Sequence, residues 1–469
     1  MSLADRFRTH SVDNQAPPLA GYDAYAEDRA LREAVGAYGG SWGDDHLSTY
    51  GRLVGGELIE LGFAANASRP QPKLFDRYGH RIDEVEFHPA YHRILELAMA
   101  HGVHSYAWRH PRRGAHVVRT ALAYLHNQAD QGTSCPLTMT YAAVPALRHE
   151  AAVAEAWLPR ITSFEYDRRL VAADAKRGCM VGMGMTEKQG GSDVRANTTR
   201  ATPAGDGGYE LVGHKWFFSA PMCDAFLVLA YAEGGMTCFL LPRFKPDGSR
   251  NEIRIQRLKD KLGDWSNASS EVEFQGAWAQ RVGPEGRGVS TIIDMVALTR
   301  LDCMSGSASI MRQSLVQALH HCAHRKAFGK RLVEQPLMRN VLADLALESE
   351  AATWLAARVA FAVDQAPTDA GQAAFARIAT AIGKYWICKR AAVFVNEAQE
   401  CLGGAGYVEE SMLPRLYRQA PLNSIWEGSG NIQCLDVLRC IAREPETREA
   451  LFAELVAAHG VHPSLDRET

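Results

Sequence analysis

The chain has 469 residues, which is enough for about three units of ordinary domain size. Hydrophobic residues make up 46% of it and charged residues 22%, which excludes a wholly disordered protein because there is ample apolar surface to bury. The formal net charge of −3 excludes a generic polycationic nucleic-acid binder but is compatible with a local basic patch.

Targeting and metal-binding signals are missing from the sequence. The N-terminal residues Met1 to Arg6 contain no apolar signal core, and no uncharged run approaches the roughly 18 residues of a membrane span. The ten cysteines form no CxxC pair, which favours reduced thiols. His320 and His324 stand one helical turn apart without a further ligand nearby, which favours a solvated helix face. We expect a cytoplasmic protein without a membrane or metal site.

The first part of the chain, residues 1–180, has the apolar period of amphipathic helices. Pro89 suits the first turn of a helix whose buried face carries Tyr91, Ile94, Leu95 and Ala98. Residues 68–85 contain prolines and a glycine, and we expect a loop there. An N-terminal helical domain follows from these patterns.

Residues 181–283 change to a period of two. Apolar residues alternate with polar ones around Ile253 and Ile255, and again around Val272 and Phe274. The segment 226–231 is a short apolar run typical of a buried strand, and the glycine-rich segment 205–208 predicts a hairpin turn between its flanking strands. We therefore expect a middle β-sheet or barrel domain.

The helical period returns after residue 284. Ile378 and Ile382 lie one turn apart, as do Leu355, Val359 and Val363. Long helices with short connections predict a C-terminal helical bundle over 284–445, followed by a tail over 446–469. The expected fold class is therefore α+β, with a helical domain, a β domain and a helical bundle in that order.

Three segments could carry chemistry, and each also has a purely structural interpretation. Residues 182–193 combine glycines with the hydroxyls of Thr186 and Ser192, which suits either a ligand cradle or an elaborate loop. Glu427 lies between Trp426 and Gly428, which suits either a general base or a capped turn. Residues 403–406 suit a phosphate site or a helix C-cap. No GxGxxG follows a strand, so a Rossmann dinucleotide site is not expected.

Taken together and in order, the motifs of this chain resemble those of the acyl-CoA dehydrogenase family, over nearly its whole length. The resemblance is carried by Met185-Thr186-Glu187 with Gly191-Ser192-Asp193, Lys215 to Ser219, Arg325 to Gly329 with Gln335, Gln399 to Tyr407, and Trp426-Glu427-Gly428. Within the family, the AidB-like alkylation-response branch is most similar, through the stretches GMGMTEKQGGSDV, NTTRA, LVGHKWFFS, RLKDKLG and NSIWEGSGNI.

The resemblance implies that the protein binds FAD without a Rossmann fold. It implies flavin or substrate contacts from residues 185–192 and 217–219, contacts to the FAD of a neighbouring subunit from the 325–335 segment, and further contacts from the ends of the bundle helices. The implied cofactor residues are Met185, Thr186, Gly191, Ser192, Phe217, Phe218, Ser219, Arg325, Phe328, Gln335, Gln399, Gly403, Gly404, Asn423, Trp426, Gly428, Ser429 and Asn431.

The implied activity is desaturation of an acyl thioester between Cα and Cβ. Glu427 would remove the α-proton with Arg300 nearby, while the β-hydride passes to flavin N5. The resemblance also implies a homo-oligomer, most simply a tetramer, and an electron-transferring flavoprotein as acceptor.

The alternative from another functional class is an alkylation-damage-response flavoprotein with weak dehydrogenase activity and nucleic-acid association. In that branch a further helical domain after the bundle supplies the DNA contacts. Here only residues 440–469 follow Arg439, and the segment from Ala442 to Thr469 has three Arg against six Asp or Glu, a net −3. Because an acidic segment opposes phosphate binding, we do not expect duplex DNA binding.

Overall fold

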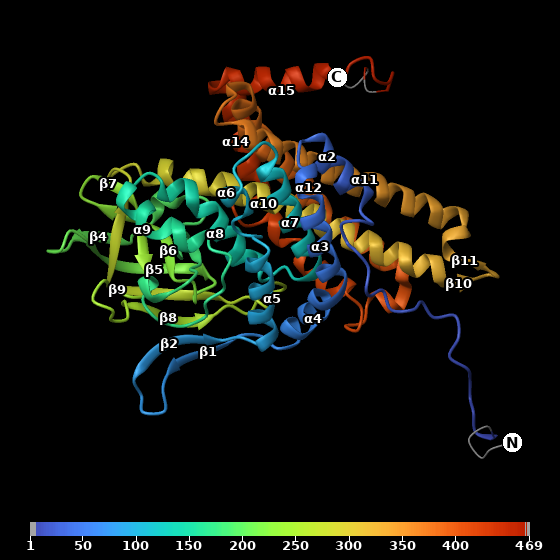
Figure 1. Cartoon of the computed structure of the whole chain (residues 1–469), viewed down its shortest axis with the longest axis horizontal. Coiled ribbons are helices and arrows are strands. Elements are labelled where there is room, and N and C mark those ends of the chain that lie inside the picture. Colours follow the sequence, from blue (N-terminus) through green and yellow to red (C-terminus); the bar gives the residue numbers. More distant parts are fainter. Residues whose placement is uncertain (1–5, 465, 467–469) are drawn as a thin grey trace.

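The computed structural model describes residues 6–464 and 466. It forms a helical N-terminal region, a closed β-sheet and a bundle of long helices (Figure 1). The sheet lies at one end of the long helices, and the N-terminal helices cover one side of both. This arrangement confirms the predicted fold class.

The N-terminal region begins with helices that bury their apolar faces against one another. The helix predicted from Pro89 is α5, with Pro89 in its first turn and the His88 side chain accepting a hydrogen bond from the Ala90 amide. The helices are α2 (Arg29–Ala37), α3 (Asp44–Leu53), α4 (Ile59–Ala67), α5 (Pro89–Ala100), α6 (Tyr106–Arg109), α7 (Ala115–Ala129), α8 (Ser134–Leu147) and α9 (Ala151–Ile161).

The prediction of a loop over residues 68–85 is wrong, because this segment forms an antiparallel hairpin of β1 (Gln71–Phe75) and β2 (Arg81–Glu86). Strand β1 is mostly exposed and β2 is mostly half-buried, so the regular apolar alternation that would reveal two strands is absent. Tertiary contacts hold them instead: the Ile255 amide donates to Asp83 at 2.8 Å, and Arg81 donates to the Ile255 carbonyl at 2.6 Å.

The middle region is a sheet that closes on itself, which confirms the predicted β domain. The predicted hairpin across 205–208 is present, since β4 and β5 pair antiparallel there. Its strands are β3 (Val181–Gly184), β4 (Arg200–Pro203), β5 (Tyr209–Ser219), β6 (Ala225–Ala232), β7 (Gly235–Pro242), β8 (Ile253–Leu258) and β9 (Ser269–Val282). The closure runs through β4, β5, β9, β7 and β6, with β8 on β9 and β3 on β6.

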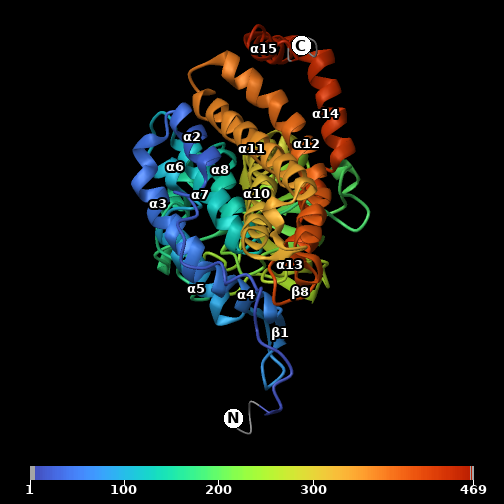
Figure 2. The same cartoon turned by 90° about the vertical axis from the view of Figure 1, so that its right-hand side faces the viewer.

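The last region is the bundle, in which α10, α11 and α12 lie side by side (Figures 1 and 2). The expected C-terminal tail contains a helix, α15, that crosses one end of the bundle. The elements are α10 (Gly288–His324), the short strands β10 (Lys326–Ala327) and β11 (Lys330–Arg331), α11 (Pro336–Gln365), α12 (Ala370–Leu402), α13 (Leu413–Gln419), α14 (Gly430–Arg443) and α15 (Pro445–Ala457).

The cysteines and the two candidate histidines take no part in a bridge or cluster. All ten cysteines are free thiols, and only Cys434 is exposed. The His320 and His324 rings each contact a backbone carbonyl, of Pro17 and His320 respectively. Within the described residues, no group of His, Cys, Asp and Glu could hold a metal ion. No described helix is long and apolar enough to cross a lipid bilayer.

Candidate active site

The loop between β3 and β4 is anchored from beneath by the fully buried Glu187. Its carboxylate accepts hydrogen bonds from Lys215 Nζ at 2.9 Å, the Thr199 hydroxyl at 2.6 Å and the Thr198 amide at 2.7 Å. Burial alone would raise the pKa of Glu187, but the Lys215 ammonium and these hydrogen bonds lower it to about 2. The ionised carboxylate therefore fixes the loop that carries Thr186, Gly191 and Ser192.

The end of β5 carries side chains that could bind a ligand, namely those of Phe217 and Ser219, with Thr186 next to the strand. The Trp216 amide donates to the Thr186 carbonyl at 2.9 Å, which sets Thr186 beside this strand, and the Ser219 and Ser269 hydroxyls lie 3.0 Å apart. The Phe217 ring is 50% exposed, and no side-chain partner is found for the Thr186 hydroxyl among residues 6–464 and 466. A half-exposed ring beside a free hydroxyl fits a flat, polar heterocycle such as the flavin of FAD.

Neighbouring residues of the same motif divide between the two sides of the sheet. The Phe218 side chain is fully buried and contacts the Phe226 ring at a centroid distance of 4.0 Å, so it packs in the core of the sheet and only its backbone can face a ligand. Met185 is half-buried and its carbonyl accepts from Asn197 at 2.8 Å, while Gly191 and Ser192 are exposed.

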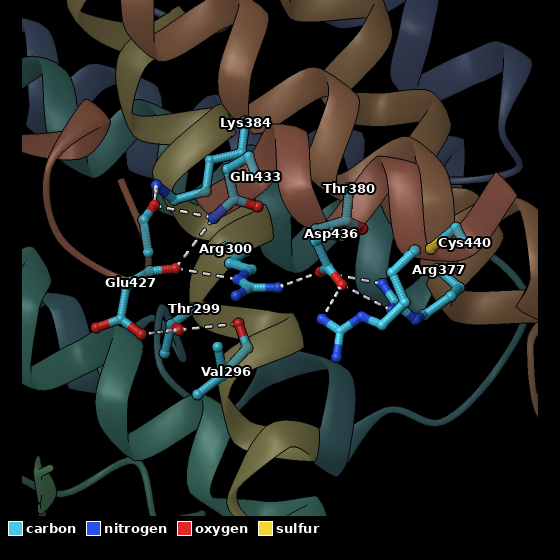
Figure 3. Close-up of polar contacts among 12 residues, drawn as sticks. Val296, Thr299, Arg300, Arg377, Thr380, Lys384, Glu427, Gln433, Asp436 and Cys440 are labelled. Atoms are coloured by element: carbon cyan, nitrogen blue, oxygen red, sulfur yellow. Dashed lines mark hydrogen bonds and ion pairs between the residues drawn. The ribbon is translucent and has the colours of Figure 1, made fainter. Parts of the chain in front are cut away.

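The loop that carries Glu427 has a strained backbone. Glu427 has a φ of 57° and Gly428 a φ of 91°; the left-handed conformation is one that non-glycine residues rarely adopt. Lys384 Nζ donates to the carbonyls of Asn423, Trp426 and Gly428 at 2.9, 2.9 and 2.8 Å. These contacts hold the loop in a conformation that directs the Glu427 side chain away from Lys384 and toward Thr299 on α10 (Figure 3).

The Glu427 carboxylate makes one hydrogen bond in the described structure. The Thr299 hydroxyl on α10 lies 2.7 Å from its Oε2 and 3.0 Å from the Val296 carbonyl. Since a hydroxyl has one proton, Thr299 donates to Glu427 when that carboxylate is ionised, and can accept from it while donating to Val296 when it is protonated. Thr299 thus provides a partner for both forms of an acid that exchanges a proton.

The surroundings of Glu427 favour the protonated form more than water does. Burial raises the pKa of Glu427 above its ordinary 4.5, against the Thr299 hydrogen bond and the charges of Lys384 and Arg300, which lower it. A carboxylate with a raised pKa is a stronger base, which is what abstraction of a weakly acidic proton requires.

Arg300 supports the main chain of Glu427 and does not touch its carboxylate. Its Nε donates to the Glu427 carbonyl at 3.0 Å, and its other arm pairs with Asp436 at 2.9 Å (Figure 3). Arg377 and Arg439 bind the same Asp436 carboxylate. The structure therefore places the predicted catalytic arginine in a network that positions the loop.

The sequence analysis overlooked Lys384, Thr299, Gln433 and Asp436 at this site. Lys384 could have been found, because it is the only charged residue in the run from Ile378 to Cys388. A lysine in an otherwise apolar helix segment is almost never buried unless it is paired, so its presence indicates a specific partner. Thr299, Gln433 and Asp436 give no such signal, since each fits an ordinary helix.

A chain of polar contacts leads from the end of β5 toward Cys135 on α8. Ser269 lies beside Ser219 and 3.4 Å from Lys261 Nζ, and Lys261 pairs with Asp264 at 2.8 Å. Burial raises the pKa of the Cys135 thiol on α8, and the charges of Asp264, Lys261 and Glu427 all act on it. The Cys135 thiol therefore senses charges from both the β domain and the Glu427 loop.

The rest of the Glu427 loop is built into the bundle. Asn423 donates to the Ser307 hydroxyl at 3.0 Å and accepts from the Trp426 indole at 2.9 Å. Ser429 precedes α14 as its N-cap residue, and Asn431 lies exposed in that helix's first turn.

A second group of predicted cofactor residues lies at the far end of the bundle. Arg325 follows α10 some 26 residues after Thr299, or about 39 Å along a helix. Cys322 and the Cys401 carbonyl are 3.8 Å apart, so the exposed Gly403 and Gly404 and the nearby Gln399 share this end. Phe328 is 98% exposed with a φ of 52°, and Gln335 donates to the Ala327 carbonyl at 3.0 Å. One chain therefore does not bring Arg325, Phe328 and Gln335 to Glu427.

Comparison with known families matches the chain in three consecutive segments. They are the adaptive response protein AidB N-terminal domain over residues 14–168, the acyl-CoA dehydrogenase middle domain over 182–277, and the acyl-CoA dehydrogenase C-terminal domain over 286–442.

Individual relatives agree with these matches. The chain is 48% identical to AidB of Escherichia coli (strain K12), over 98% of this chain and 86% of that protein. It is 32% identical to acyl-CoA dehydrogenase family member 11 of Caenorhabditis elegans, over 84% of this chain and 66% of that protein. The crystal structure of Caenorhabditis elegans ACDH-11 in complex with C11-CoA is similar with a TM-score of 0.90 and 26% identity, over 99% of this chain and 82% of that one.

Proposed function

Because this chain belongs to the AidB branch of the acyl-CoA dehydrogenase family, whose members are FAD-dependent oxidoreductases, we propose that it desaturates an acyl thioester at Cα–Cβ with Glu427 as the base. The observation that carries this proposal is the Glu427 carboxylate itself. It is held on a strained loop, has a raised pKa and keeps one oxygen free of protein hydrogen bonds within the described chain.

Glu427 would take the α-proton of the thioester onto its carboxylate. Thr299 then changes from donor to acceptor, donating its own proton to the Val296 carbonyl, so the neutral acid keeps a partner. A positioned general base typically accelerates a reaction ~10²–10⁴-fold. Bound FAD would supply the acceptor for the β-hydride, and Thr186, Phe217 and Ser219 are the residues that would hold its flavin.

The carrier, the electron acceptor and the assembly belong to the same proposal. The ACDH-11 structure contains C11-CoA, which supports coenzyme A as the carrier. Electrons would leave to an electron-transferring flavoprotein. In a homo-oligomer, Arg325, Phe328 and Gln335 of one subunit would complete the FAD site of another, which agrees with their distance from Glu427.

An anaerobic titration tests the proposal. The FAD-loaded protein is mixed with acyl-CoAs of graded chain length, and the flavin absorbance is followed, with free coenzyme A as the control. We expect at least one acyl-CoA to bleach the flavin. If the protein holds about one FAD per chain and none of them bleaches it, the dehydrogenase proposal is wrong.

The second candidate function is a role in the response to alkylation damage, with weak dehydrogenase activity and nucleic-acid association. The 48% identity to AidB favours it. Unbleached flavin together with duplex DNA binding at physiological salt would support this candidate over the first.

A further inference from the structure

Lys384 is a fully buried lysine that donates all its hydrogen bonds to backbone carbonyls and none to a carboxylate. Its side chain is 1% exposed, and among the described residues no carboxylate lies within ion-pair distance of Nζ. Each of the three ammonium protons has a carbonyl acceptor at 2.8–2.9 Å. Burying a charge is costly unless it is paired or well solvated by dipoles, so this lysine needs an explanation that packing does not give.

The three acceptors belong to the loop that bends around Glu427. Trp426 and Gly428 are its immediate neighbours in the chain, and Asn423 begins the segment. Three carbonyls can converge on one nitrogen only if the chain curls around it. The positive φ values of Glu427 and Gly428 are the local conformations that produce this curl.

Lys384 does not bind the carbonyl of Glu427 itself, and two further side chains donate hydrogen bonds to it. Arg300 Nε and Gln433 Nε2 donate to the Glu427 carbonyl at 3.0 and 3.2 Å, and Gln433 also donates to Gly428 at 2.9 Å (Figure 3). Lys384 comes from α12, Arg300 from α10 and Gln433 from α14. The loop is therefore fixed by three helices, and Lys384 makes the largest share of the contacts.

The Lys384 charge also acts on the carboxylate that the loop presents. Burial raises the pKa of Glu427, and the Lys384 and Arg300 charges and the Thr299 hydrogen bond lower it. The other titratable groups that sense Glu427 are the thiols of Cys135 on α8 and Cys303 on α10. Both thiols have a raised pKa and stay neutral, so Lys384 and Arg300 supply the charge that favours the ionised base.

We propose that Lys384 is the positioning residue of the catalytic loop: it holds the backbone on both sides of Glu427 and keeps a buried positive charge against that loop. It touches neither the proton nor the reacting carbons. This inference rests on the proposed role of Glu427 as the base, but the hold on the loop can be tested without activity.

Hydrogen exchange tests the hold on the loop in the FAD-loaded protein. In Lys384→Met we expect the amides of residues 423–430 to exchange at least about tenfold faster than in the wild type, with exchange in the β-sheet unchanged. Lys389→Met is the matched control, because Lys389 is exposed on the same helix and makes no hydrogen bond to the loop, and Met keeps the aliphatic stem that packs against Gly430. Equal exchange in Lys384→Met and Lys389→Met would overturn the positioning role.

The pH dependence of flavin reduction tests the charge. With the cation gone, Glu427 should be protonated at higher pH, so the acid limb of kcat/KM should move to higher pH in Lys384→Met and Lys384→Gln. Lys384→Arg keeps the charge but cannot bring three N–H groups to one point, so its acid limb should stay near the wild type while its rate falls.

The outcomes separate the two proposals. An acid limb that does not move in either neutral variant would contradict the electrostatic role of Lys384. If the wild type reduces its flavin with no thioester, the proposed reaction fails, and the hydrogen-exchange result still decides whether Lys384 holds the loop. If Lys384→Met does not fold, Lys384→Gln and Lys384→Arg provide the same two readouts.

Discussion

Thr299 is the residue on which the protonation of Glu427 most directly depends, because its hydroxyl is the only hydrogen-bond partner of that carboxylate among the described residues. Thr299→Val removes the hydrogen bond at nearly constant volume. Since the bond lowers the pKa of Glu427, its loss should raise that pKa further, and flavin reduction below neutral pH should slow about tenfold.

The measurement is the pH profile of kcat/KM for flavin reduction, with Thr380→Val as the control. Thr380 is a buried threonine on α12 that donates only to its own helix, at the Ala376 carbonyl. The control should keep the wild-type profile. An acid limb of Thr299→Val at or below that of the wild type would show that Thr299 does not stabilise the ionised base.

At the scale of single elements, the loop between β3 and β4 depends on the buried pair of Glu187 and Lys215. The folded-state pKa of Glu187 is lowered to about 2, so the pair stabilises the fold fully above the ordinary value of 4.5. That contribution is lost as the pH falls from about 4.5 to about 2. Glu187→Gln leaves a buried lysine without its partner and should cost about 3–5 kcal/mol at neutral pH.

Thermal unfolding between pH 3 and 7 measures this effect. The wild type should lose stability steeply on the acid side, and Glu187→Gln should show a shallower dependence from a lower starting point. Glu210→Gln, an exposed position on β5, should follow the wild type throughout. If Glu187→Gln were as stable as the wild type at pH 7, the pair would not anchor the loop.

Elements with a strong apolar period were predictable from the sequence, and those without one were not. Helix α5 and the β4–β5 hairpin follow from Pro89, the apolar stripe and the glycine-rich turn. The β1–β2 hairpin has no regular apolar alternation and depends on contacts with Ile255, which no local pattern records.

The site was predictable to a similar extent. Motif positions indicated Glu427 and Thr186, but a motif does not tell which of Phe217 and Phe218 faces outward, because adjacent strand residues point to opposite sides. Arg300 was expected near Glu427, but the motif did not tell that it binds the main chain of that residue and not its carboxylate. Such details depend on how α10, α12 and α14 meet, which only the folded structure determines.

For the whole molecule, the two ends of the bundle predict that cofactor binding and assembly are linked. The exposed segment with Arg325 and Phe328 is far from Glu427 in its own chain, so we expect it to complete the FAD site of a neighbouring subunit. Light scattering should find the FAD-loaded protein as a tetramer, or at least a dimer, and Arg325→Ala should weaken both FAD binding and assembly. A monomer that carries about one FAD would contradict this prediction.

The charge of the whole molecule predicts weak binding to duplex DNA. The net charge is −3, and the segment after the bundle is acidic, although Arg467 and Glu468 within it lie outside the described residues. At about 150 mM salt we expect no binding tighter than the micromolar range of non-specific association. A gel shift at several salt concentrations measures it, and submicromolar affinity with a steep salt dependence would refute the prediction.

The most direct test of the central claim compares wild type and Glu427→Gln in anaerobic stopped-flow flavin reduction, with whichever acyl-CoA bleaches the wild type. The substitution is nearly isosteric, so folding and FAD content should be unchanged. Loss of the general base should slow flavin reduction at least about a hundredfold. Reduction of the variant within about threefold of the wild type would show that Glu427 is not the base.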